Sequence, residues 1–364
     1  MKTYPLESVS MEEAKKLQFK LVDEITKVFN GVDILNCGDV GVVSGQNKPT
    51  TTRKVETVLA NFFGAEAAVL VRGAGTAAIR YALFSIIKSG ETLLIHKAPV
   101  YSTTQTTLEM MGIKTVEADF NNLDDIQKVM QENSQIKAAL VQITRQKSDD
   151  SYDLKSVINK IKSCGEIPII TDDNYAVMKI KEIGIQCGAD LSCFSTFKLL
   201  GPEGIGCIVG NKKEIDFIIK HHYSGGSQTQ GPEALEVLRG MIYAPVALSI
   251  QAEVGEEVVR RLSENEVPMV KSALLANAQS KVILIEFEED IAEKVLSHAQ
   301  KLGAAPHPVG AESKYEFVPM FYRVSGTFLD EDSTRGKRMI RVNPMRSGPD
   351  TIIRILKKSI EEVK

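Results

Sequence analysis

Between about residues 65 and 210, short apolar runs alternate with segments whose apolar residues recur every three or four positions. Short apolar runs are typical of buried strands, and the wider spacing is typical of amphipathic helices such as residues 76–88 and 154–163. Strands that alternate with helices along a chain form a mostly parallel sheet with helices on both faces. The alternation therefore predicts an α/β fold on a seven-stranded sheet. The candidate strands are residues 67–71, 92–96, 115–119, 138–143, 168–171, 191–195 and 206–209.

The two ends of the chain follow other patterns. Residues 1–60 predict one helix, around residues 11–29, followed by a polar segment at 37–52 that suits a surface or a neighbouring subunit. After residue 209 a helix-rich connection runs to about residue 265. The remaining chain is typical of a small β-α-β-β-α domain, with elements at 281–287, 291–302, 321–325, 339–343 and 349–363. Since cores rarely grow beyond about 250–300 residues, we expect separate parts. They are an N-terminal helix with a dimer-contacting segment (1–60), a large α/β domain (61–250) and a small C-terminal α+β domain (251–364).

Composition excludes several classes of protein. A net charge of −3 without a lysine or arginine run argues against a nucleic-acid-binding surface. No apolar stretch approaches the ~20 residues of a membrane-spanning helix, and the N-terminus lacks a signal-peptide core. The five cysteines are scattered, without metal-ligand spacing. We therefore expect a reduced, cytoplasmic protein with no metal site.

Lys198 is the residue that is most informative about the chemistry of this chain. It follows the apolar run at 191–195 and precedes the turn Leu199-Leu200-Gly201. Burial lowers the pKa of a lysine, and a deprotonated amine can form a Schiff base with an aldehyde. Asp172 ends another apolar run 26 positions earlier. A carboxylate and a lysine at neighbouring strand ends suit pyridoxal 5'-phosphate (PLP), the first for the ring nitrogen and the second for the aldehyde carbon. By itself, Lys198 is also compatible with a snorkelling or helix-capping lysine.

The order of these residues resembles a known family. Asp172-Asp173-Asn174-Tyr175, then Gly188-Ala189-Asp190-Leu191, then Lys198 is similar to the cystathionine lyase-like branch of fold-type I PLP-dependent enzymes, in the aspartate aminotransferase superfamily. The run Lys198-Leu199-Leu200-Gly201-Pro202 resembles selenocysteine synthase-like proteins. The likeness extends from about Pro49 to the C-terminus. It implies a fold-type I architecture, a PLP-dependent transferase or lyase, and Lys198 and Asp172 as catalytic residues.

A glycine-containing turn follows the first strand and opens a helix. Glycines let the backbone approach a ligand, and helix N–H groups bind phosphate. The candidate phosphate-binding residues are Gly73, Ala74, Gly75, Thr76 and Ser195. A plain strand-to-helix turn with a threonine cap is the alternative. A dinucleotide site is disfavoured, because Ala78 stands where a third glycine is needed and His96 where an acidic residue is needed. Phe197 replaces a threonine of the resembled lyases, which puts one phosphate contact in doubt.

Further candidates come from loops at the predicted sheet edge. The resemblance implies that Tyr101 stacks on the cofactor ring, with His96 as the competing residue. It also implies that the polar loop 223–231, with Gln228, reaches the phosphate of a partner subunit; a surface linker is the alternative.

Arginines supply the candidate substrate contacts. Arg145, at the end of the fourth strand, faces the crevice where α/β sheets bind ligands. It is a candidate for the cofactor or a substrate acid, or else for a surface salt bridge. Arg341 lies inside an apolar strand and needs a carboxylate partner. The resemblance implies that it binds the substrate carboxylate, with Arg323 and Arg346 as alternatives and a structural ion pair as the remaining interpretation.

These residues together predict a homodimeric, possibly tetrameric, PLP enzyme acting at Cα of a small amino acid. Lys198 would hold the cofactor as an internal aldimine. Aminotransferase-like chemistry, β/γ-elimination of sulfur amino acids and racemisation share these groups, so the sequence leaves them open. A catalytically silent PLP-binding protein and a nucleotide-dependent oxidoreductase are the alternative functions.

Overall fold

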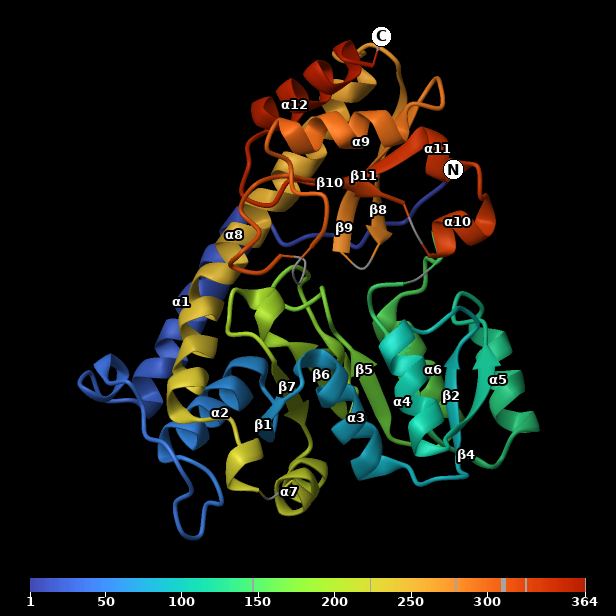
Figure 1. Cartoon of the computed structure of the whole chain (residues 1–364). Helices are drawn as coiled ribbons and strands as arrows, with labels where there is room; N and C mark the ends of the chain where they lie inside the picture. The colour runs from blue at the N-terminus through green and yellow to red at the C-terminus, as the bar shows by residue number, and fades with distance from the viewer. Residues whose placement is uncertain (146, 223, 279, 309–311, 325, 364) are drawn as a thin grey trace. The chain divides into compact units, whose positions relative to one another are not determined.

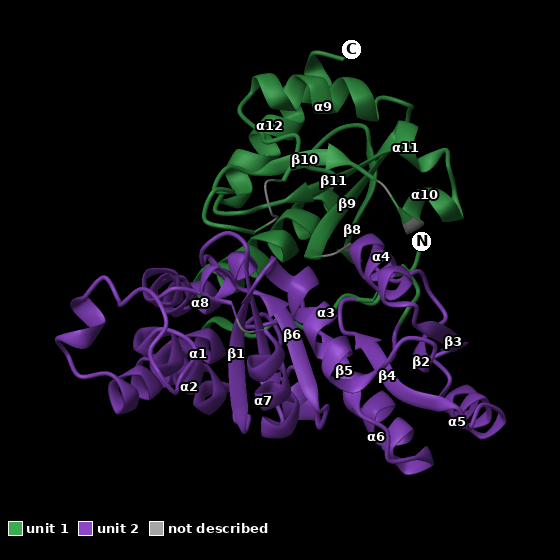
Figure 2. Ribbon diagram, turned by 60° about the horizontal axis from the view of Figure 1, so that its bottom comes forward, with its two compact units in different colours: residues 1–11, 145–150, 246–364 green, residues 12–144, 151–245 purple. Residues whose placement is uncertain are grey.

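The computed structural model describes residues 1–145, 147–222, 224–278, 280–308, 312–324 and 326–363. The chain forms two compact units, coloured separately in Figure 2. Unit 1 contains residues 1–11, 145–150 and 246–364, and unit 2 contains residues 12–144 and 151–245. The chain passes from unit 2 to unit 1 at Pro245, inside the long helix α8 (Gly231–Ser263).

Unit 2 is built on a seven-stranded sheet in the order β1-β7-β6-β5-β4-β2-β3. Only β7 runs antiparallel to its neighbours, so the expected mostly parallel sheet is confirmed. Every predicted strand is present, with ends shifted by at most two residues. The strands are β1 (Ala67–Arg72), β2 (Thr92–His96), β3 (Lys114–Ala118), β4 (Ile136–Gln142), β5 (Ile169–Asp172), β6 (Leu191–Ser195) and β7 (Ile205–Gly210).

Side chains alternate between the two faces of this sheet, and helices cover both (Figure 1). On β4, Ala138 and Leu140 pack into the core with α3, α4 and α7, whereas Ala139 and Val141 pack with α5 and α6. The helices of unit 2 on these faces include α3 (Ala74–Ile86), α4 (Ser102–Met111), α5 (Leu123–Glu132), α6 (Leu154–Cys164) and α7 (Lys212–His221). Strands buried on both faces explain the continuous apolar runs of the sequence.

The prediction of one helix in residues 1–60 was wrong. The segment forms α1 (Met11–Val28) and then begins a second helix, α2 (Thr50–Phe63). The Asp39 carboxylate accepts the backbone N–H groups of Thr50 and Thr51 at 2.7 and 2.8 Å, which satisfies two donors that a helix N-terminus leaves open. The capping residue lies 11 positions upstream, outside the short spacing in which helix caps are recognised from sequence.

Unit 1 holds a four-stranded antiparallel sheet in the order β10-β11-β9-β8, which confirms a small C-terminal domain. The predicted β-α-β-β-α order was incomplete, because it assigned no strand to β8. The elements are β8 (Val270–Ala278), β9 (Ser280–Phe287), α9 (Ala292–Lys301), β10 (Met320–Arg323), α10 (Thr327–Glu331), α11 (Arg335–Arg338), β11 (Met339–Asn343) and α12 (Pro349–Glu361). The core includes Ile283 and Phe287 of β9 with Ile340 of β11.

Candidate active site

The site begins where β5 ends. Asp172 is the last residue of β5, is buried, and pairs in register with Cys193 of β6. Alternation places Asp172 and Asp173 on opposite faces. Asp173 accepts a bond from the Thr171 hydroxyl at 2.7 Å and one from the Gly184 N–H at 3.1 Å. Asp173 therefore fixes the short 3₁₀ helix at Gly184–Cys187. The Asp172 side chain lies on the opposite face of the sheet.

Asn174 lies in the loop after β5 and contacts both predicted catalytic residues. Its Nδ2 donates to Asp172 Oδ1 at 2.8 Å, and its backbone N–H donates to the same oxygen at 3.1 Å. Its Oδ1 accepts from Lys198 Nζ at 3.2 Å and from the Ser195 backbone N–H at 3.0 Å. One amide thus joins the carboxylate, the amine and the end of β6.

Lys198 lies on a one-turn 3₁₀ helix, Thr196–Leu199, that follows β6. The strand itself ends at Ser195, so the lysine is delivered by the turn rather than by the strand. Its Nζ lies 3.8 Å from the centroid of the Tyr175 ring, where the negative face of the aromatic ring attracts a cation. Lys198 is half-buried.

Three residues other than glycine adopt positive φ around this position. They are Ala74 (56°), Tyr175 (64°) and Leu200 (62°). Each such residue costs on the order of 1–3 kcal/mol and persists only where the surroundings enforce it. Helix α8 packs closely against the Leu200 turn, since a side chain on Gly240 would overlap the Leu200 backbone. Strain of this kind clusters at functional sites, and here it marks the turns that carry Gly75, Asn174 and Lys198.

The predicted phosphate turn has two different halves. The N–H groups of Gly73 and Ala74 both donate to Gly204 O, at 2.7 and 3.0 Å. Gly75 and Thr76 follow at the start of α3, where N–H groups have no acceptor within their own helix. A side chain on Gly75 would overlap the Asn174 amide, so glycine is required there. An anion would therefore meet Gly75 and Thr76 rather than all four residues.

Burial dominates the electrostatics of both aspartates. Burial raises the pKa of Asp172, while the bond from Asn174 and the charge of Lys198 act in the opposite direction. Burial raises the pKa of Asp173 to about 7, against the bonds from Thr171 and Gly184. An ionised carboxylate at Asp172 thus depends on its polar neighbours.

Two aromatic candidates lie in different settings. Tyr101 precedes α4 and is 38% exposed. Its turn approaches the phosphate turn, since the hydroxyls of Thr76 and Thr103 lie 3.0 Å apart. His96 ends β2, is buried, and packs its ring against Phe120 and Tyr152. This placement favours Tyr101 as the residue for a ligand ring.

The polar loop after α7 makes hydrogen bonds to other residues of the same chain. The side-chain amide of the buried Gln228 donates to His222 O, and Arg72 Nε donates to Gln228 O at 3.2 Å. Tyr223, the first residue of this predicted loop, lies outside the described residues.

The arginine candidates all belong to unit 1. Arg145 is buried and its Nη2 donates to Tyr4 O at 2.6 Å. The Arg341 guanidinium lies 4.3 Å from the centroid of the Tyr322 ring, and its Nε donates to Arg323 O at 3.1 Å. Arg346 Nη1 donates to Gln251 Oε1 at 2.9 Å, and burial lowers the pKa of Arg346.

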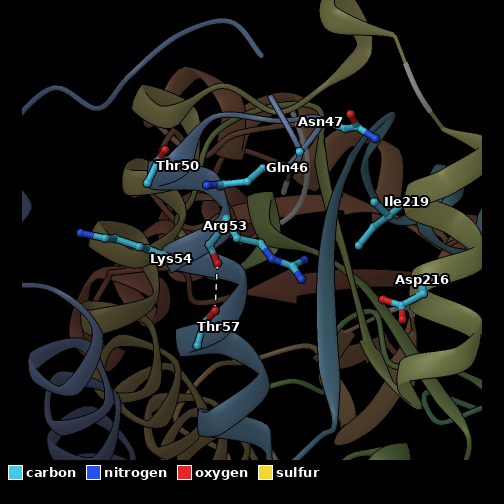
Figure 3. Close-up of a pocket in the computed structure, with 9 residues that line it drawn as sticks. Gln46, Asn47, Thr50, Arg53, Lys54, Thr57, Asp216 and Ile219 are labelled. Atoms are coloured by element: carbon cyan, nitrogen blue, oxygen red, sulfur yellow. Dashed lines mark hydrogen bonds between the residues drawn. The ribbon is translucent and has the colours of Figure 1, made fainter. Parts of the chain in front are cut away.

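A separate cavity of about 430 Å³ lies in unit 2 (Figure 3). It is lined by the turn at 45–47, by Thr50, Arg53, Lys54 and Thr57, and by Asp216 and Ile219 of α7. None of the predicted cofactor residues lines it.

The residues at the sheet edge fit PLP. A primary amine, a buried carboxylate and a helix N-terminus with an obligatory glycine supply partners for an aldehyde, a ring nitrogen and a phosphate. In the described part of the chain, no group of three or more histidine, cysteine or acidic side chains could hold a metal. No described helix is long and apolar enough to cross a membrane. Sequence reasoning assigned no role to Asn174 or Tyr175, although both stand in the motif that contains Asp172.

Comparisons with known proteins agree with this chemistry. A family model described as "Cys/Met metabolism PLP-dependent enzyme" matches residues 42–302, and one described as "YhfS-like, C-terminal domain" matches residues 256–356. The chain is 51% identical to "Uncharacterized protein YhfS" of Escherichia coli (strain K12) over 363 residues, covering both chains completely. The crystal structure of the PLP-dependent protein YhfS from Escherichia coli matches with a TM-score of 0.98 over the whole of both chains.

Two lyases are more distant relatives. The chain is 24% identical over 228 residues to an L-methionine gamma-lyase of Fusobacterium nucleatum subsp. polymorphum, covering 60% of this chain and 56% of that protein. The structure of apo CalE6, a methionine gamma lyase from Micromonospora echinospora, matches with a TM-score of 0.72 at 15% identity, covering 95% of this chain and 98% of that chain. The second likeness is one of fold alone.

Proposed function

We propose that this chain, which belongs to the Cys/Met metabolism PLP-dependent enzyme family, cleaves a carbon–sulfur bond of a small sulfur-containing amino acid. Its cofactor is PLP. The nucleotide-dependent oxidoreductase considered from the sequence has no support in this family. The observation that carries the choice of reaction is the similarity to an L-methionine gamma-lyase.

The overall reaction balances without a second organic substrate. A thioether amino acid and water give a thiol, a 2-oxo acid and ammonium. An aminotransferase would instead require a 2-oxo acid as amino-group acceptor. This difference separates the two reaction classes that the sequence left open.

The chain's own residues have separable tasks. PLP, when bound, supplies an electron sink for the electrons left at Cα. Lys198 Nζ would hold the aldehyde carbon and, once displaced by the substrate amine, move the proton from Cα. The Asp172 carboxylate would pair with the ring nitrogen, while the N–H groups of Gly75 and Thr76 bind the phosphate and Tyr101 stacks on the ring. Ser195, Gln228, Gly73 and Ala74 remain candidates for further cofactor contacts.

Substrate recognition needs a cation for the α-carboxylate. We assign this to Arg341, because an arginine can bind a carboxylate through two parallel hydrogen bonds. Arg145 is the second candidate. Arg341→Lys should raise KM for the amino acid more than it lowers kcat, since the charge remains and the bidentate geometry is lost.

Exposed apolar side chains support a homodimer. Four of them lie between residues 19 and 40 of unit 2 and are 64–82% exposed: Phe19, Val32, Leu35 and Val40. Apolar patches on a soluble protein mark interfaces, and two-fold dimers are the commonest oligomers. Sedimentation velocity should give a dimer for the natural sequence and a monomer for Leu35→Glu/Val40→Glu; a tetramer or an active monomer would contradict this assembly. The five cysteines, all in the described part of the chain, form no disulfide, which suits the cytoplasmic location that we propose.

One experiment tests the reaction. The protein reconstituted with PLP is incubated with a panel of sulfur-containing amino acids, and 2-oxo acid, thiol and ammonium are measured with and without an added 2-oxo acid. Equal amounts of thiol and 2-oxo acid without the additive support the lyase. Turnover that requires the additive would identify an aminotransferase, and absorbance changes without turnover would identify a silent PLP-binding protein.

A further inference from the structure

Asn174 occupies the position where the carboxylate of β5, the end of β6 and the amine of the following turn come together. Its side chain and backbone N–H make four hydrogen bonds to three residues: two to Asp172, one to Ser195 and one to Lys198. Asn174 and Lys198 are 24 positions apart in the sequence. A single amide therefore fixes the relative placement of two chain segments that the folding of the sheet brings together.

The two ends of this amide face opposite kinds of partner. An ionised carboxylate only accepts hydrogen bonds, and a backbone N–H and an ammonium only donate them. Nδ2 faces the Asp172 carboxylate, and Oδ1 faces the Ser195 N–H and Lys198 Nζ. The opposite amide orientation would turn an acceptor toward the carboxylate and donors toward two donors. The partners thus determine the orientation of the amide.

Shape restricts the position as well. A side chain on Gly75 would overlap the Asn174 amide from the start of α3. Asn174 also follows Asp173, whose carboxylate is held on the other face of the sheet. An aspartate at 174 would have the right shape but would put a second negative charge against Asp172.

We propose that Asn174 is a positioning residue for the PLP site: its amide donates to the Asp172 carboxylate and holds the Lys198 amine at one fixed place beside it. The proposal rests on the PLP site of the proposed function but not on the choice between lyase and aminotransferase. Burial raises the pKa of Asp172, and the side-chain bond from Asn174 is the largest influence in the opposite direction. An ionised Asp172 is what a protonated ring nitrogen requires as a partner.

The titratable groups that bear on Asp172 come from three segments. They are Lys198 on the turn after β6, Asp173 directly after β5, and the Cys193 thiol of β6, whose pKa is raised by burial and by both aspartates. Removing the Asn174 amide removes none of these titratable groups, but it takes away the hydrogen bond that holds the Lys198 amine. A change in titration behaviour after its removal therefore reports on the amide.

The test compares Asn174→Ala and Asn174→Leu with the neighbouring control Asp173→Asn. Two quantities that need no turnover are measured: the Kd of the apoprotein for PLP, and the midpoint of the pH titration of the lysine-bound cofactor followed by absorbance. Both Asn174 variants should bind PLP about tenfold more weakly, because a hydrogen bond to a charged group is lost. The midpoint should move to higher pH, because a less ionised Asp172 leaves the ring nitrogen unprotonated, and a neutral ring withdraws fewer electrons from the nitrogen bound to Lys198.

The control keeps the result interpretable. Asp173→Asn should lower the urea midpoint of the apoprotein and leave the absorbance midpoint within about 0.2 pH units of the natural sequence, a margin small beside a one-unit shift. Unchanged Kd and midpoint in Asn174→Ala would overturn the proposal, as would an equal spectral shift in Asp173→Asn. If Asn174→Leu fails to fold, Asn174→Ala alone decides. Absence of carbon–sulfur cleavage in the natural sequence would reject the proposed function while leaving this comparison intact.

Discussion

Unit 2 contains two arrangements of a lysine near a buried carboxylate, and they differ in how the partners meet. Lys48 Nζ lies 2.6 and 2.9 Å from the two carboxylate oxygens of Glu56, and both side chains are at most 2% exposed. Glu56 Oε1 also accepts the Leu70 N–H of β1 at 2.9 Å. At the sheet edge, by contrast, the Asn174 amide bonds to both Asp172 and the half-buried Lys198.

The difference separates a structural pair from the pair to which we assign a role in the reaction. The direct contact of Lys48 with Glu56 neutralises a buried charge and joins the N-terminal polar segment, α2 and β1, so neither partner can leave without a large loss of stability. At the sheet edge, Asn174 donates hydrogen bonds to the Asp172 carboxylate. The Lys198 amine can therefore move away while Asp172 keeps a hydrogen-bond donor. A lysine that must exchange partners during a reaction needs the second arrangement.

The largest expected effect is that of Lys198→Ala. Activity should fall on the order of 10³-fold or more, because a group that acts in the chemical step is removed, while the urea midpoint stays near that of the natural sequence. Borohydride reduction followed by peptide mapping should label Lys198 in the natural sequence. Labelling of Lys48, Lys97 or Lys179 instead would refute the assignment.

Lys48→Met should have the opposite effect to Lys198→Ala, with its main loss in stability. It leaves Glu56 buried without its cation, which costs about 3–5 kcal/mol, and denaturant unfolding of the apoprotein measures this loss. The double variant Lys48→Met/Glu56→Gln should recover part of the stability, since glutamine is uncharged and still accepts the Leu70 N–H. A single variant as stable as the natural sequence would show that the two lysine arrangements do not differ as described.

Asp172→Asn sharpens the comparison on the carboxylate side. Loss of a preorganised charge at the reacting centre should lower kcat about 10²–10³-fold, with a small change in stability. Asp173→Asn should retain most of the activity, because Asp173 faces Thr171 and Gly184. Steady-state kinetics of both variants measure this difference. Full activity in Asp172→Asn and loss of activity in Asp173→Asn would assign the ring-nitrogen partner to Asp173 instead.

The smallest effect concerns pH. The pKa of Asp173 is about 7 in the folded protein against an ordinary value of 3.8, so the folded state binds the proton more tightly than the unfolded state. This contribution to the free energy of unfolding is complete below about pH 4 and is lost as the pH rises through about 7. Asp173→Asn carries no titrating proton, so the difference in unfolding free energy between the natural sequence and this variant should change across pH 4–8. A difference that is constant over this range would contradict the raised pKa.

The sequence by itself determined the sheet and pointed to Asp172 and Lys198 as candidate site residues. The continuous apolar runs of buried strands and the period of three to four of helices are set by neighbouring residues, so the strands of unit 2 were located within two residues. The order of Asp172 and Lys198 was visible because Asp172 ends one recognisable apolar run and Lys198 closely follows another. The family follows from that order.

Only the tertiary structure decided which polar side chains meet. The cap that begins α2 comes from Asp39, the partner of Lys48 also binds β1, and the amide that contacts Lys198 lies 24 positions before it. Strand β8 was missed because pairing with β9 defines it more clearly than its own sequence does. Such contacts depend on where distant segments are brought together, and no local period of the sequence records that. The sequence therefore pointed to Lys198 and Asp172, but only the folded structure showed that Asn174 lies between them.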